Sequence, residues 1–177
     1  MSDFLELALR RQSCRTFSDR PVEHEKLVKC VEAARNAPSG CNSQPWSFVV
    51  VEDPAIVAEV AKTTQQLGIN EYQSKAKAFL VVVEEYARLM PKIAPLVDSQ
   101  VFAKGDLGGA TLSFCLQAES LGLGTCIIGL FDRPKLRELL NIPELKSIFL
   151  VVAIGYSSTD HVRPKQRKPL EEIVRFV

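Results

Sequence analysis

Two short stretches of the chain have the composition of anion-binding segments. The first, Arg10 to Arg15, concentrates three arginines and the hydroxyl of Ser13 within six residues. The second, Arg163 to Pro169, carries four cations and is stiffened by two prolines. Guanidinium groups present planar sets of donors that match phosphate oxygens, and a hydroxyl adds one more hydrogen bond. A single basic segment is typical of a solvated surface, but the two together favour a phosphate site.

A third stretch, Ala37 to Trp46, combines small residues, amides and two prolines between a predicted helix and a predicted strand. This composition is typical of a rigid loop that exposes hydrogen-bonding groups. Local explanations stay open for single residues in these stretches. Ser13 could cap a turn, and Asn42 could brace its own loop through an Asx turn.

The composition fits one globular domain and excludes several function classes. The 177 residues, 46% of them hydrophobic, are enough for a single domain over residues 1–177 with a substantial core. A net charge of +1 gives no field that would attract nucleic acid. No apolar run approaches the ~20 residues of a membrane span, and the N-terminus lacks the pattern of a signal peptide. We therefore expect no nucleic-acid or membrane partner and a cytoplasmic location.

The cysteines are read as free thiols in a reducing compartment. The chain has five, with no C-x-x-C spacing and only two histidines, so no zinc site is expected. Cys30 and Cys115 fall on apolar helical stripes and are predicted to lie in the core. Cys14, Cys41 and Cys126 fall inside polar motifs, but no histidine lies nearby in sequence to activate a nucleophile.

Hydrophobic periodicity predicts an α+β fold with a mixed central sheet flanked by helices. Helices are expected over residues 4–11, 19–36, 54–66, 100–120 and 134–140. Buried strands are expected over residues 46–51, 79–83 and 147–154. Residues 84–99, with two prolines, are predicted to form a broken helix or a mobile cover.

The predicted helix over residues 100–120 is apolar on most sides, so it should be buried on most sides. It could lie at the centre of a monomeric domain, or it could pack against both its own sheet and a partner subunit. Asp106 on this helix is expected to be a structural hydrogen-bond acceptor rather than a catalytic base.

Taken with their order, these motifs make the chain similar to the FMN-dependent nitroreductase family over essentially its full length. The matching segments are residues 11–17, 37–46, 121–132, 155–156 and 165–170, which read RQSCRTF, APSGCNSQPW, LGLGTCIIGLFD, GY and KQRKPL. The resemblance implies a homodimer with FMN at the subunit interface and NADH or NADPH as reductant. It also implies a ping-pong reaction at the flavin N5 atom, with no catalytic side chain or metal and with a small nitroaromatic, quinone or enone as acceptor.

The resemblance further implies roles for individual residues. The expected phosphate contacts are Arg11, Ser13, Lys165 and Arg167, and Arg15 is expected at the ring edge near O2. The partner subunit would contribute Pro38, Ser39, Gly40 and Asn42, while backbone groups of Ile128 and Gly129 would approach N5 and O4. Asn70 would bind the pyrimidine edge. Gln12 stands where a second basic residue or a histidine is common, so contacts to the ribityl chain could differ. Gln73 stands where many members carry a lysine, and Lys75 could substitute for it.

Two other functions stay open at this point. The first is different reduced-flavin chemistry on the same scaffold, namely flavin fragmentation or reductive dehalogenation. The second is a non-enzymatic FMN carrier or redox sensor, with Cys41 or Cys126 as its switch. A dedicated substrate-reading lid would favour the first, and flavin binding without reduction by a pyridine nucleotide would favour the second.

Overall fold

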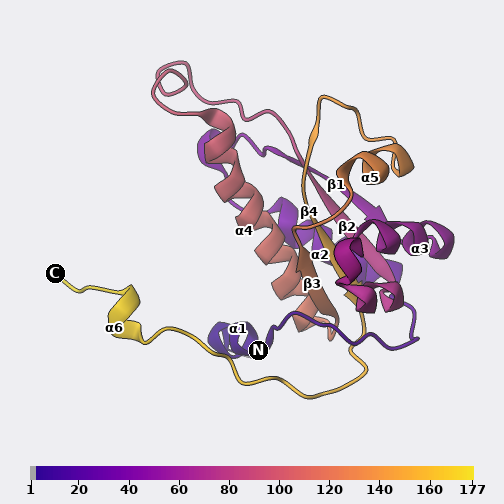
Figure 1. Ribbon diagram of the computed structural model, residues 1–177. Helices are drawn as coiled ribbons and strands as arrows, with labels where there is room; N and C mark the ends of the chain where they lie inside the picture. The colour runs from indigo at the N-terminus through magenta and orange to yellow at the C-terminus, as the bar shows by residue number, and fades with distance from the viewer. Residues whose placement is uncertain (1–2) are drawn as a thin grey trace.

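The computed structural model describes residues 3–177, which form one central sheet covered by helices on both faces (Figure 1). The sheet has four strands in the order β1-β2-β4-β3. Their bounds are Trp46–Val51 for β1, Ala78–Glu84 for β2, Gly124–Ile128 for β3 and Ser147–Gly155 for β4. The central strands are buried for most of their length, which accounts for their continuous apolar sequences. The predicted α+β class and the three expected strands are confirmed.

The strand directions differ from the expected mixed sheet, because every strand pair is antiparallel. Helix α3 (Pro54–Thr63) and two 3-10 turns after it remain at the end of the sheet where β1 finishes. Strand β2 therefore starts at that end, with Phe79 opposite Val51, and runs back along β1. Parallel pairing is limited, within residues 3–177, to an isolated bridge between Ser13 and Thr125.

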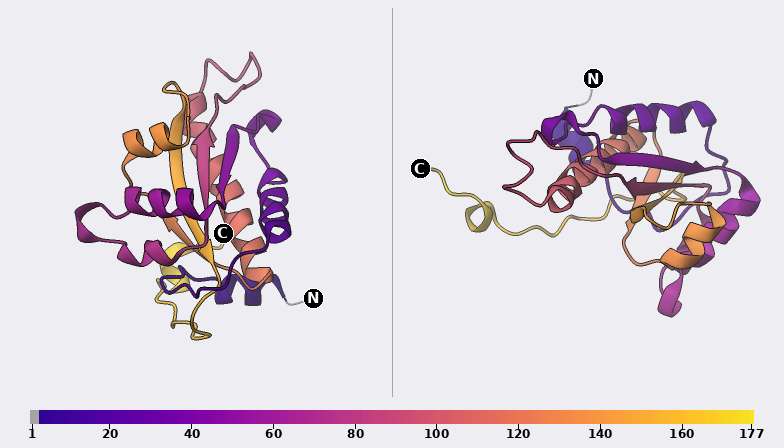
Figure 2. Two further views of the ribbon diagram at one scale, coloured as in Figure 1. Left: turned by 90° about the vertical axis from the view of Figure 1, so that its right-hand side faces the viewer. Right: turned by 90° about the horizontal axis from the view of Figure 1, so that it is seen from above.

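The helices form two layers, one on each face of the sheet (Figure 2). Helices α2 (His24–Arg35) and α4 (Ser99–Ser120) cover one face, where Leu27, Leu107 and Phe114 belong to a shared core cluster. Helices α3 and α5 (Arg133–Leu139) cover the other face. Helix α1 (Phe4–Arg10) lies beside the C-terminal end of α4, to which an Arg10–Glu119 ion pair connects it.

Helix α4 buries one face and exposes the other in the single chain. Its buried face includes Cys115, which is fully buried, as is Cys30 on α2; both were predicted to be core. On its outer face Val101, Phe102 and Leu112 are between 49% and 63% exposed. The outer face therefore has no apolar cover from residues 3–177, which favours the second of the two interpretations of this helix.

Several boundaries differ from the sequence prediction. Helix α2 starts only at His24, because Asp19 pairs with Lys77 instead of capping the helix. Residues 85–98 form no helix or strand, and α3 ends at Thr63. Strand β3 was not predicted, and neither was helix α6 (Leu170–Ile173) in the C-terminal arm. Among the helices of residues 3–177, none is long and apolar enough to cross a bilayer.

The start of α2 is held to the end of β4 by a small polar network. The hydroxyl of Tyr156 donates to Glu23 Oε2 at 2.6 Å, and Lys26 Nζ donates to the same hydroxyl at 2.6 Å. The Tyr156 hydrogen bond is the main reason why the pKa of Glu23 falls from 4.5 to about 2, and Glu23's own backbone amide and Arg20 also contribute. The charged carboxylate therefore stabilises the folded state.

We expect Glu23→Gln to lower the melting temperature at pH 7, because the amide keeps the shape of the side chain but loses its charge. The contribution of Glu23 is complete above pH 4.5, its ordinary pKa, and is lost as the pH falls toward about 2. The difference in melting temperature between wild type and variant should therefore shrink between pH 7 and pH 3. Glu25→Gln, which removes the same charge from the same turn, is the control. A difference as large at pH 3 as at pH 7 would contradict this assignment.

Candidate functional site

The two basic segments lie together and form the walls of one cleft. The cleft has a volume of about 330 Å³ and is lined by residues 11–13, Arg15 and residues 163–167. The N-terminal wall follows the end of α1, and the other wall is the extended C-terminal arm, which crosses beneath it (Figure 1). The predicted pairing of these distant segments is therefore present in the fold.

Hydrogen bonds between the segments fix the cleft walls. The ammonium of Lys165 donates to the carbonyl oxygen of Arg11, and the guanidinium of Arg163 donates to Gln12 Oε1 at 3.1 Å. Arg163 also donates to the carbonyl oxygen of Ser13. Gln12 Nε2 in turn donates to the carbonyl oxygen of His161 at 2.8 Å. The Gln12 side chain thus holds the arm in place, and its contact with a cofactor stays a prediction.

The cleft carries an excess of positive charge. Within residues 3–177, Arg11, Arg15 and Arg163 make no ion pair with a carboxylate, nor do Lys165 and Arg167. The pKa of Lys165 lies below its ordinary value, mainly because the ammonium is partly desolvated and then because Arg11 and Arg167 are close. Like charges held together with no carboxylate in direct contact indicate a site for an anion.

Two of the cleft residues are free to bind a ligand. Among the described residues, neither the hydroxyl of Ser13 nor the guanidinium of Arg15 takes part in a hydrogen bond, and both residues line the cleft. Ser13 is positioned by its main chain, which pairs with Thr125 of β3. A hydroxyl and several guanidinium groups around one space form a donor set that fits a phosphate monoester.

A second group of predicted residues lies along the other side of β3. Asn70 has a left-handed backbone conformation, with φ of 62°, and its Nδ2 donates to the carbonyl oxygen of Thr64 at 3.1 Å. The hydroxyl of Tyr72 donates to Asn70 Oδ1 at 2.7 Å. Ile128 ends β3, and Gly129 follows it at an exposed position. Tyr72 lies 4.0 Å from the sulfur of Cys126, so β3 connects this group to the cleft.

Gln73 is the most unusual polar residue of this group. Its side chain is fully buried, and its amide nitrogen and oxygen have no hydrogen-bond partner within residues 3–177. A buried polar group without a partner costs about 1–3 kcal/mol, so a structure that keeps one calls for an explanation. Gln73 lines none of the described pockets, so the protein alone does not show what this amide would bind.

The predicted loop residues lie far from the cleft. The 3-10 turn Gly40–Asn42 is held against α4 by a hydrogen bond from Gly40 N to Asp106 Oδ2 at 3.0 Å, which confirms Asp106 as a structural acceptor. The approach is so close that a Cβ on Gly40 would lie 2.1 Å from the Phe102 ring. Pro38, Asn42 and Cys41 are exposed.

Helix α4 separates this loop from the cleft. Asp106 contacts the loop, and Glu119, near the C-terminal end of the helix, pairs with Arg10 beside the cleft. Thirteen residues of helix span about 20 Å. One chain therefore does not bring Pro38, Ser39, Gly40 and Asn42 to the cleft, so these residues can meet a ligand there only from a second copy.

Arg163 is a cleft residue to which the sequence assigned no role. It belongs to the basic C-terminal segment, so its charge was visible, but its hydrogen bonds to Gln12 and Ser13 depend on how the arm crosses the N-terminal segment. The other predicted site residues are neither confirmed nor contradicted by the described contacts. No cluster of potential metal ligands occurs among residues 3–177.

Comparison with protein families gives one match, to the model described as the nitroreductase family, over residues 8–156. This span includes the N-terminal cleft segment, the loop at residues 37–46 and the whole sheet. It ends before the basic arm.

Individual proteins extend the similarity over the arm. A protein of Archaeoglobus fulgidus named NADH dehydrogenase/NAD(P)H nitroreductase is 33% identical over 97% of this chain and 91% of its own length. The iodotyrosine deiodinase of Nematostella vectensis is 26% identical over 98% of this chain and 74% of its own length. The crystal structure of an FMN-dependent nitroreductase from Clostridium difficile superposes with a TM-score of 0.78 at 25% identity, covering 97% of this chain and 98% of that one.

Proposed function

The chain belongs to the nitroreductase family of oxidoreductases, and we propose that it is an FMN-dependent enzyme that takes hydride from NADH or NADPH. The electrons would pass to a small oxidised acceptor such as a nitroaromatic, a quinone or an enone. The observation that carries the proposal is the cleft whose cations have no carboxylate partners among the described residues. A cytoplasmic location belongs to the same proposal.

The cleft residues would hold the phosphate of FMN. Arg11 and Arg167 supply guanidinium donors, Lys165 a point charge, and Ser13 a free hydroxyl. Desolvation and then the nearby cations Arg11 and Arg167 lower the pKa of Lys165, and a bound dianion would relieve the repulsion among these cations. Arg163 would act indirectly, because it fixes the main chain of Ser13 and the side chain of Gln12.

The residues along β3 would orient the ring. Gln73 has an unsatisfied amide that can donate and accept, Asn70 lies next to it in the same turn, and Arg15 adds a positive charge. When bound, FMN would supply the hydride-accepting N5 atom, in a ping-pong sequence in which nicotinamide leaves before the acceptor enters. No side chain of this chain needs to act as acid or base; the protein binds, orients and excludes water.

A homodimer is part of the proposal, because one chain leaves both the site and its apolar surface incomplete. Pro38, Ser39, Gly40 and Asn42 would reach the site from the partner. Part of the exposed apolar surface lies on α1, on the outer face of α4 and on the arm, at Phe4, Leu5, Leu9, Val101, Phe102, Leu112, Leu170, Ile173 and Phe176. The arm leads away from the body of the chain (Figures 1 and 2). Exposed apolar surface of this extent marks an interaction site.

Reductive dehalogenation is a second candidate, favoured by the similarity to iodotyrosine deiodinases. It would use the same cleft and the same flavin, and it would differ in the acceptor. A non-enzymatic FMN carrier is the third possibility.

The test is a visible absorption spectrum of the FMN-loaded protein, recorded without oxygen before and after addition of NADH or NADPH. We expect the flavin band to bleach with at least one of the two nucleotides. Free FMN at the same concentration, without the protein, is the control. A nitroaromatic, a quinone and a halogenated phenol are then added separately, and return of the band identifies the acceptor class. A bound flavin that neither nucleotide bleaches would contradict the reductase and support the carrier.

A further inference from the structure

Two buried cysteines lie side by side where the N-terminal segment runs along β3. Ser13 pairs with Thr125 in parallel orientation, and the amide of Cys14 donates to the carbonyl oxygen of Thr125 at 2.8 Å. In parallel pairing the next residues on each segment are neighbours and face the same side. Those residues are Cys14 and Cys126, and both belong to the core cluster between the sheet and α3.

The surroundings of Gly124 show which face of β3 the Cys14 side chain lies on. Gly124 lies two residues before Cys126 on β3, so a side chain there would share the face of Cys126. A Cβ on Gly124 would lie 2.7 Å from Cys14 Cβ and 2.8 Å from Cys14 Sγ. The Cys14 side chain therefore packs directly on the face of β3 that carries Cys126.

Regular parallel pairing at this point would place the Cα atoms of Cys14 and Cys126 within the range of a disulfide. Neighbouring strands lie about 4.8 Å apart, and disulfides join Cα atoms about 4.4–6.8 Å apart. The two thiols have only weak partners at present: Cys14 Sγ donates to the carbonyl oxygen of Thr16 at 3.4 Å, and Cys126 Sγ lies 4.0 Å from the hydroxyl of Tyr72. Formation of the bond would require both sulfurs to turn away from these partners.

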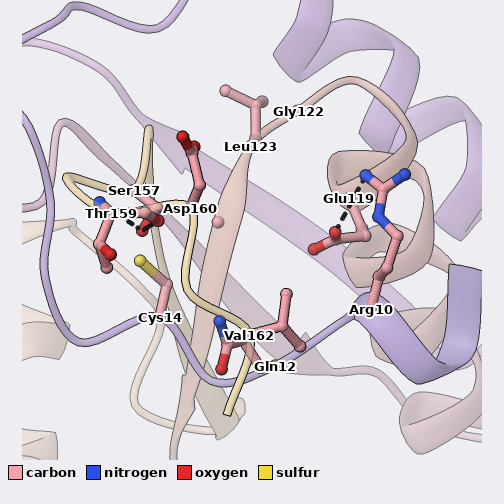
Figure 3. Close-up of a pocket in the computed structure, with 11 residues that line it drawn as sticks. Arg10, Gln12, Cys14, Glu119, Gly122, Leu123, Ser157, Thr159, Asp160 and Val162 are labelled. Atoms are coloured by element: carbon pink, nitrogen blue, oxygen red, sulfur yellow. Dashed lines mark hydrogen bonds and ion pairs between the residues drawn. The ribbon is translucent and has the colours of Figure 1, made fainter.

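Cys14 is also accessible to a small oxidant, which distinguishes it from most core cysteines. It lines a pocket of about 350 Å³ next to the phosphate cleft. Figure 3 shows its sulfur directed toward Ser157 and Thr159 across that pocket. Cys30 and Cys115 line no described pocket, and exposed Cys41 has no cysteine neighbour of this kind.

We propose that Cys14 and Cys126 form a redox-active dithiol that a peroxide oxidises to a disulfide. With hydrogen peroxide as the oxidant, the Cys14 thiol loses its proton and the thiolate attacks one peroxide oxygen. The O–O bond breaks, the leaving hydroxide takes up that proton as water, and a sulfenic acid remains. The thiol of Cys126 then attacks the Cys14 sulfur, which forms the S–S bond and releases a second water. The two thiols lose two electrons and two protons, and a dithiol reductant reverses the change.

The bond would tie the predicted phosphate-binding segment to β3, because Ser13 and Arg15 flank Cys14. Burial raises the pKa of the Cys14 thiol above its ordinary value, although Thr16, Ser157 and Arg163 act in the opposite direction. Oxidation should therefore be slow at neutral pH and faster under mildly alkaline conditions, where more thiolate is present. Formation of the disulfide does not depend on the proposed flavin chemistry.

The test is peroxide treatment of the full-length Cys41→Ser protein, with and without FMN, followed by thiol alkylation in denaturant and peptide mass analysis. We expect two fewer alkylated thiols, a cross-linked peptide pair containing Cys14 and Cys126, and full recovery with dithiothreitol. The circular dichroism spectrum should stay that of a folded protein.

Two variants separate this pair from the other cysteines. Cys126→Ser should leave oxidised Cys14 without a partner, so that it accumulates as sulfenic or sulfinic acid. Cys30→Ser, at another buried position, should form the same disulfide as the parent. A folded parent protein in which Cys14 stays alkylatable, or is over-oxidised without a cross-link, would overturn the proposal.

Discussion

Replacing Lys165 and Arg167 together with alanine is expected to weaken FMN binding about 100-fold or more. Both residues line the cleft, and neither has a carboxylate partner among the described residues. Hydrogen bonds to charged groups contribute about 1.5–3 kcal/mol each, and each 1.4 kcal/mol is a factor of about ten in Kd. Two such contacts to one phosphate therefore account for the expected loss, which a fluorescence titration of apoprotein with FMN would measure.

Riboflavin separates a phosphate role from a general loss of structure, because it has the ring and ribityl chain of FMN but no phosphate. We expect the double variant to bind riboflavin as the wild type does. Lys168→Ala is the matched control, since Lys168 lies in the same arm but does not line the cleft. The melting temperature of the variant apoprotein should change little, because removal of like charges near Arg11 offsets loss of the hydrogen bond from Lys165 to the carbonyl oxygen of Arg11. Unchanged FMN affinity, or an equal loss for riboflavin, would contradict the assigned phosphate site.

The sequence was most informative where a short segment carries its own chemistry. Residue type alone indicated a phosphate site between the two basic segments, and the family resemblance then assigned roles to Arg11, Ser13 and Lys165. The buried strands and α4 were also predictable, because their apolar patterns extend over many residues.

Features that depend on distant parts of the chain were not predictable in this way. Strand β2 runs antiparallel to β1 because α3 and the turns after it stay at the end of the sheet where β1 finishes. Strand β3 has only five residues and starts with Gly124, so its pattern is too short to be recognised. The burial of Gln73 and the contact of Cys14 with β3 leave no local signal, because both depend on what packs against them.

The loop at residues 37–45 illustrates a third case. Its composition predicted a rigid loop, but Cys41, Asn42 and Gln44 all have positive φ values near 50°, and only Asn commonly adopts this conformation. Packing against α4, through Gly40 and Asp106, holds this backbone in place. The same packing puts the loop about 20 Å along α4 from the cleft, so the proposed site would need a second chain to bring the loop to the cleft.

Leu112→Glu is therefore expected to dissociate the dimer and to weaken FMN binding at the same time. Leu112 is 49% exposed on the outer face of α4 in the single chain. A glutamate at this position would bury an unpaired carboxylate in an apolar interface, which is strongly unfavourable, and two-fold symmetry would bring two such changes into one dimer. We expect the dimer Kd to rise about 100-fold or more, as measured by analytical ultracentrifugation over a range of concentrations.

Leu145→Glu is the matched control, because Leu145 is fully exposed in the segment between α5 and β4, away from α4 and the arm. It should leave both the dimer and FMN affinity unchanged.

Removal of residues 170–177 is an independent test, since it deletes exposed Leu170, Ile173 and Phe176 but keeps Lys165 and Arg167. If the loop acts from the partner, FMN affinity must fall with the fraction of dimer in both interface variants. A monomeric variant that binds FMN as tightly as the wild type would show instead that one chain holds the cofactor alone.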